Sequence, residues 1–266
     1  MSVSPHDDER VRVEADEAEL EGSRADAMTA VLEEGDRAEH VWTAEDFADG
    51  DWEHPDTRPR MRGWLHLFAF FGAIVAGAVL IPLASVLGAR AGFSVALYCL
   101  TILGLFGVSA LYHRRRWSPR GWKIMKRLDH SMIFLFIAGT YTPVSALALA
   151  PDTARWVLTV VWGGALLGVL LKTVWPHAPS WFAVPVYMAL GWVAVFVLPE
   201  LLTNGGVAAF VLLLAGGALY TAGAVFYATK WPNPWPHTFG YHEFFHAATV
   251  LAALCHLVAI WVVLLR

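Results

Sequence analysis

Only four carboxylates serve the last 206 residues of this 266-residue chain, and this shortage constrains the fold more than any other feature. Residues 61–266 hold four acidic and 13 basic side chains, whereas residues 1–60 hold 19 acidic and six basic ones. A soluble domain carries charge on about a quarter of its residues, so residues 61–266 cannot cover a surface exposed to water. We therefore predict a membrane domain over residues 61–266 and exclude a soluble single-domain enzyme.

Apolar runs long enough to cross a bilayer follow one another through this membrane domain. About 20 apolar residues span the hydrocarbon core as a helix. The expected segments are 63–88, 92–112, 129–149, 154–173, 180–199, 206–228 and 242–264. The predicted fold class is therefore an all-α membrane protein, a bundle of seven transmembrane helices. Cys99 and Cys255 lie inside apolar runs and are expected to pack as small buried side chains.

Residues 1–60 are expected to form an acidic, mostly disordered tail. Low hydrophobicity with high net charge is typical of disorder. The tail contains no apolar run of the kind that opens a secretory signal peptide, so the first membrane helix is expected to serve as the signal. Trp42, Phe47 and Trp52 are the tail side chains that could dock against a partner, but a solvated tail is the default expectation.

Positive charges gather between the second and third apolar segments, and they predict the orientation. The basic residues there are Arg114, Arg115, Arg116, Arg120, Lys123, Lys126 and Arg127. Because such loops stay in the cytoplasm, we expect a cytoplasmic N-terminus and an outside C-terminus in the plasma (inner) membrane. Membrane lipids are the expected partners. No pattern indicates nucleic acid, and none predicts an oligomeric state.

A few ionisable residues at membrane depth are the functional candidates, because such residues are costly in lipid. His242 and His246 are four residues apart, which places both imidazoles on one helix face and suits a shared metal ion. Ser109 and His113 have the same spacing, and Asp129 opens the third segment. The predicted topology brings these groups to one depth near the cytoplasmic face. Three histidines and a carboxylate there favour an open zinc site, with a position left for water.

Several motifs resemble the hemolysin III family, which is related to the progestin and adipoQ receptors and more distantly to alkaline ceramidases. The motifs are Ser109–His113 with the Arg-rich stretch after it, Arg127–Ser131, Ile137–Pro143, and His242-x-x-x-His246 with His256 ten residues on. The resemblance covers residues 61–266 and implies a seven-helix bundle with zinc near the cytoplasmic face. Leu65 and His66, with Gly72, resemble the family only loosely, and the acidic tail is outside its pattern.

The resemblance also implies roles for individual residues. The zinc ligands would be His113, His242 and His246, and Ser109 and Asp129 would lie beside the bound water. The implied activity is zinc-dependent hydrolysis of a lipid amide or ester, carried over from the ceramidase and adiponectin-receptor relatives. Asp129 would accept the proton of the water, and Ser109 would orient that water or stabilise the oxyanion.

Two other functions stay open. In a non-enzymatic protein, such as a cytolysin or a membrane-stress factor, zinc would only hold the helices together. A pore-forming cytolysin has less support, because no polar stripe of the kind that lines a pore repeats along several helices. An intramembrane metalloprotease would use Glu243 of the His242–His246 motif as its base. Such a protease needs a third metal ligand, and His256 lies about 15 Å from His246 along the helix, too far to share the ion. Glu243 is also expected to be exposed at the interface.

The remaining ionisable residues have structural interpretations. His66 and His130 are expected to be mainly interfacial, although His66 could support the site if its helix packs beside it. His256 is expected to be a buried, hydrogen-bonding histidine. Glu200 falls in an outside loop with no partner evident from the sequence.

Overall fold

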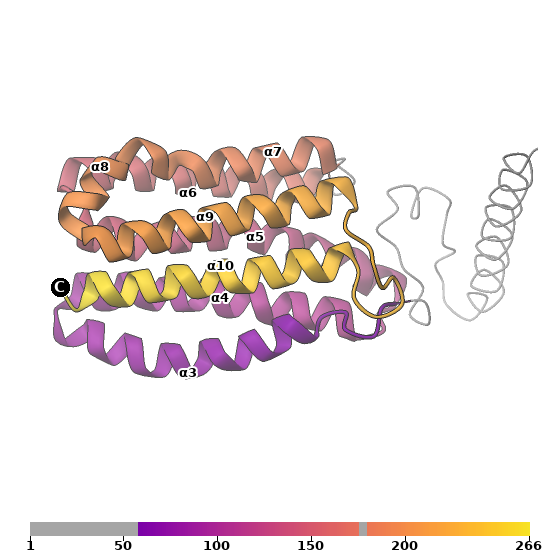
Figure 1. Ribbon diagram of the computed structural model, residues 1–266. Coiled ribbons are helices and arrows are strands. Elements are labelled where there is room, and N and C mark those ends of the chain that lie inside the picture. Colours follow the sequence, from indigo (N-terminus) through magenta and orange to yellow (C-terminus); the bar gives the residue numbers. More distant parts are fainter. Residues whose placement is uncertain (1–57, 176–179) are drawn as a thin grey trace, which may run out of the picture. The chain divides into compact units, whose positions relative to one another are not determined.

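A computed structural model describes residues 58–175 and 180–266, and these residues form long helices that run alongside one another (Figure 1). The long helices are α3 (Trp64–Val86), α4 (Ala89–Arg114), α5 (Pro119–Ala148), α6 (Pro151–Val174), α7 (Ser180–Gly191), α9 (Gly206–Thr229) and α10 (Tyr241–Leu264). Within the described ranges, the one β-type contact is an isolated bridge between Trp235 and Phe239. The predicted all-α fold is confirmed for this part of the chain. The predicted disordered tail lies almost wholly outside the described residues.

Six helical stretches of the described residues are long and apolar enough to cross a membrane, where the sequence predicted seven. The fifth and sixth expected segments fall together in one stretch of 46 residues, Val184–Thr229. Helical turns continue through it, because a 3₁₀ segment (Trp192–Val197), α8 (Leu198–Glu200) and a π segment (Leu201–Gly205) join α7 to α9. In Figure 1 the chain turns back within this stretch, and α7 lies beside α9. The count of seven crossings stays a prediction.

The two ends of the described bundle differ in which helices begin there. The backbone N–H groups of Arg60 and Met61, just before α3, donate to the carbonyls of His237 and Thr238, at 3.1 and 3.2 Å. The starts of α3 and α10 therefore share one end of the bundle. The C-terminus lies at the opposite end (Figure 1).

Helix α5 begins ten residues before the expected start at residue 129. Ser118 caps it by accepting a hydrogen bond from the Gly121 N–H at 3.3 Å, and Pro119 takes the first helical position. Asp129 thus lies about three turns into α5. Four of the basic residues expected in a loop lie in α5 instead: Arg120, Lys123, Lys126 and Arg127. Lysine and arginine are good helix formers, so the helix continues where the apolar run ends.

The buried core lies along α4, α5 and α10, and apolar side chains cover the outside. Tyr98 of α4, Phe134 of α5 and Ile260 of α10 are fully buried. Gly168 of α6 leaves room for the Phe134 ring, which a Cβ atom at that position would overlap. Outward-facing Val75 of α3 is 67% exposed. This arrangement suits a bundle surrounded by hydrocarbon.

Candidate metal centre

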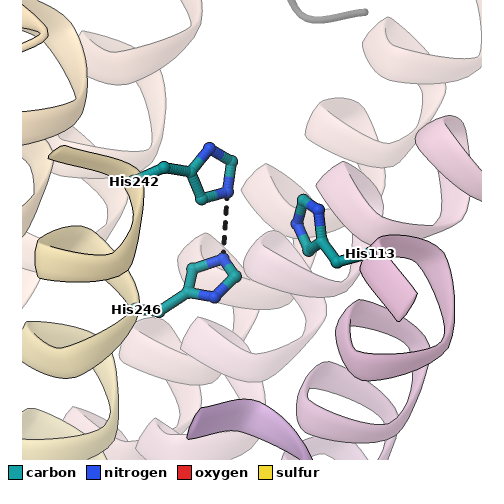
Figure 2. Close-up of side chains that lie close together, drawn as sticks. All are labelled: His113, His242 and His246. Carbon is teal, nitrogen blue, oxygen red and sulfur yellow. Dashed lines mark hydrogen bonds between the residues drawn. The ribbon is translucent and has the colours of Figure 1, made fainter. Parts of the chain in front are cut away.

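Three histidines from two helices converge at the end of the bundle where α10 begins (Figure 2). His113 lies in the last turn of α4, and His242 and His246 lie in the first two turns of α10. One ring nitrogen from each lies within 4.8 Å of the others. The Nε2 atoms of His242 and His246 are 3.1 Å apart. Two ligands at zinc–nitrogen bond length on a tetrahedral ion are about 3.3 Å apart, so this pair matches a shared ion.

The surroundings of His113 Nε2 show whether these residues fit a metal ion. His113 Nε2 is buried and has no hydrogen-bond partner among the described residues. The Oδ2 atom of Asp129 lies 3.9 Å from it, and the two side chains are 10% and 15% exposed. An unpaired buried polar atom costs about 1–3 kcal/mol, and coordination to an ion removes that cost. Three imidazoles are a donor set that Zn²⁺ accepts. The cluster could therefore hold a metal ion.

The two predicted catalytic residues lie near this cluster in different ways. Asp129 lies on α5, a third helix, and its Oδ2 atom is close to Nε2 of His113. Ser109 is 3% exposed and lies one turn before His113 on α4. The bundle therefore brings Asp129 beside His113. Ser109 lies at a buried position on α4, the helix that also carries His113.

Glu243 is buried, not exposed at the interface as the sequence suggested. Its side chain is 1% exposed, and its Oε1 atom lies 3.0 Å from Nε of Arg62, which is 5% exposed. Its Oε2 atom accepts a hydrogen bond from the Gly240 N–H at 2.8 Å, which caps the start of α10. A Glu three residues after a helix start is a recognisable capping signal. No such signal links Arg62 to Glu243, and sequence reasoning missed this arginine.

His66 is also buried, and it lies against the cluster. It is 2% exposed, and its ring stacks on the His246 ring with centroids 3.8 Å apart and an interplanar angle of 12°. His66 therefore meets the condition under which it was expected to support the site, because α3 packs with this face toward α10. Arg58, a second residue that the sequence did not single out, donates to the His113 carbonyl at 3.1 Å.

Three other ionisable residues that the sequence singled out contact backbone groups. His130 Nδ1 contacts the Lys126 carbonyl at 2.8 Å on its own helix. His256 Nε2 lies 3.2 Å from the Leu213 carbonyl, which confirms its predicted hydrogen bonding. Glu200 does have a partner, because its Oε1 atom accepts a hydrogen bond from the Ala150 N–H at the start of α6.

Comparisons with known proteins identify the family of this chain. The family described as Haemolysin-III related matches residues 56–257. The chain is 33% identical over 130 residues to Hemolysin-3 of Bacillus cereus, which covers 49% of this chain and 59% of that protein. It is 32% identical over 132 residues to the Hemolysin-3 homolog of Bacillus subtilis (strain 168), covering 50% of this chain and 61% of the relative. Each alignment thus spans about six-tenths of the relative. The apolar helices and the family match make this an integral membrane protein, and the chain belongs to the Haemolysin-III related family.

Proposed function

We propose that this protein is a zinc-dependent hydrolase of a lipid amide or ester, with its site near the cytoplasmic face of the plasma (inner) membrane. The observation that carries the proposal is the cluster of His113, His242 and His246 with the Asp129 carboxylate 3.9 Å from His113. A zinc ion held by the three imidazoles would supply Lewis-acid chemistry, which polarises a carbonyl and acidifies water.

The chain's own residues have separate tasks in this mechanism. An Asp129 carboxylate oxygen accepts a proton from the attacking water and passes it to the leaving nitrogen or oxygen. The Ser109 hydroxyl donates a hydrogen bond to the developing oxyanion of the substrate carbonyl. Because apolar side chains cover the outside of the helices, the substrate expected here is a membrane lipid that enters from the bilayer.

The variant Asp129→Asn tests the proposed proton transfer. We expect it to retain bound zinc and to lose hydrolysis by roughly 10²–10⁴-fold, since the amide cannot accept the proton. The measurements are zinc per chain by mass spectrometry and hydrolysis of ceramides and lysolipids in mixed micelles. The matched control is Asp152→Asn, because the Asp152 side chain is 95% exposed beside Arg155. Full activity in Asp129→Asn would contradict the proposal.

A second candidate function is a structural zinc site in a non-enzymatic protein. The observation that favours it is that the three imidazoles come from α4 and α10, so one ion would tie these two helices together. Zinc in the wild type without hydrolysis of any lipid would favour this function, for which the relatives' name suggests cytolysis. The protease alternative has less support, because the Glu243 carboxylate contacts Arg62 and the Gly240 N–H.

The proposed orientation has a cytoplasmic N-terminus and an outside C-terminus, with Val184–Thr229 crossing the membrane twice. The basic residues near the start of α5 support it, as does the C-terminus, which lies at the end of the bundle opposite the start of α3 (Figure 1). Alkaline phosphatase fused after Arg266 is expected to be active, because this enzyme matures only outside the cytoplasm. The same enzyme fused after Lys230 is expected to be inactive. Active fusions at both sites, or the reverse pattern, would overturn the orientation.

A further inference from the structure

His66 adds a fourth imidazole to the candidate metal centre, and its geometry differs from that of the other three. Its ring lies almost parallel to that of His246, with the centroids 3.8 Å apart and the planes 12° from parallel. The rings of His113 and His242 meet His246 at 60° and 72° instead. His66 therefore contacts the face of His246, whereas the others approach it at steep angles.

The stacked arrangement prevents His66 from sharing the ion. A histidine nitrogen binds a metal through a lone pair in the plane of its ring. Because the two rings are nearly parallel and offset by the stack, the lone pairs of His66 would not point at an ion that His246 would hold. His66 would have to leave the stack to become a ligand, so another task explains its position.

Rotation of the His246 ring is the feature that the stack restricts. The terminal torsion of histidine is broad, so the side chain alone does not select one ring plane. A large rotation of His246 would drive a ring edge into the face of His66. The His66 ring is confined in turn, since its centroid lies 5.1 Å from that of Phe106 on α4.

The position of His66 is itself set by α3. Arg62 lies in the turn two residues before α3, and His66 lies in the first turn of that helix. Glu243 and His246 are three residues apart on α10 and lie on one helix face. The Arg62–Glu243 ion pair, at 3.0 Å, joins the turn before α3 to α10, and the stacked imidazoles join the first turn of α3 to the same helix. The ion pair anchors the start of α3 where His66 needs to be.

The geometry points to His66 as a positioning residue that holds the His246 imidazole in the plane required for metal binding. This inference rests on the proposed metal site and deepens it. Neither ring nitrogen of His66 has a hydrogen-bond partner among the described residues. The flat ring, not its nitrogens, therefore does the positioning, and phenylalanine is expected to replace it.

Zinc titrations against a chromophoric chelator test this with three variants of the full chain in detergent. His66→Ala is expected to weaken zinc binding by roughly 10–100-fold, the usual effect of losing a residue that orients a ligand. His66→Phe is expected to stay close to wild type. The matched control is Phe68→Ala on the same helix, where the ring is 62% exposed and zinc binding should not change. The visible spectrum of the cobalt-loaded protein should change in His66→Ala alone.

A second measurement separates this inference from the proposed function. In metal-free protein labelled at histidine Cε1, stacking shifts the His246 Hε1 resonance upfield, and His66→Ala should abolish that shift while His66→Phe keeps it. A wild type that binds no zinc but shows the shift would refute the metal site and support the stack. Equal zinc affinity in His66→Ala and Phe68→Ala would overturn the inference. So would His66→Phe binding zinc as weakly as His66→Ala, because the nitrogens would then be needed.

Discussion

Replacing either His242 or His246 by alanine is expected to abolish stoichiometric zinc binding. The two Nε2 atoms are 3.1 Å apart, and His113 supplies a third nitrogen within 4.8 Å. With two ligands left, the binding free energy should fall by on the order of 3 kcal/mol or more, which is a hundred-fold or greater loss of affinity. Metal analysis of the purified protein by mass spectrometry, with a zinc titration of the stripped protein, measures the effect.

His256→Ala is the matched control for this experiment. His256 lies on the same helix about 15 Å from His246, and its Nε2 atom contacts the Leu213 carbonyl. Its removal tests whether loss of any half-buried or buried histidine from α10 releases zinc through a general loosening of the fold. Zinc loss in His256→Ala equal to that in His242→Ala would refute a specific site, and a wild type without bound zinc would refute the site altogether.

Arg62→Met is expected to cause the largest loss of stability among single changes near the site. It leaves the Glu243 carboxylate, 1% exposed, without the guanidinium that lies 3.0 Å from it. Breaking a buried ion pair from one side costs about 3–5 kcal/mol. In a domain of this size, that cost lowers the midpoint of thermal denaturation by roughly 6–20 °C. The measurement is thermal denaturation of the purified protein in one detergent, followed by circular dichroism.

A double variant and an exposed ion pair sharpen this test. Arg62→Met combined with Glu243→Gln removes both charges, and the glutamine oxygen can still accept the Gly240 hydrogen bond. This double variant should recover most of the lost stability. Arg155→Met breaks the 2.9 Å pair with Asp152, whose side chains are 76% and 95% exposed, so it should change little. The account fails if Arg62→Met matches Arg155→Met, or if the double variant is no more stable than Arg62→Met.

Patterns within single segments predicted much of the fold and the site. Apolar runs such as 63–88 and 92–112 correspond closely to α3 and α4, because a helix must shield its backbone from lipid along its whole length. The i, i+4 spacing placed His242 and His246 on one face, where they are found. The predicted start of this helix at residue 129 was wrong, since basic residues continue α5 back to Pro119 without any apolar signal.

Residues paired over long distances could not be predicted in the same way. Arg62 meets Glu243 and His66 meets His246 only because α3 packs against α10. The sequence also predicted a loop between α7 and α9, whereas 3₁₀ and π turns continue the helical backbone there.

The sequence by itself determined that this chain is a helical membrane protein with a candidate histidine site, because both depend on local spacing and on the cost of charge in lipid. The tertiary structure decided that Glu243 is buried in an ion pair, that Asp129 reaches His113 from a third helix, and that His66 covers a face of His246. The physical reason is that a helix shows in its own sequence which of its faces are apolar but not which helix will pack against them. The contacts that complete the site form only when α3, α4, α5 and α10 are assembled.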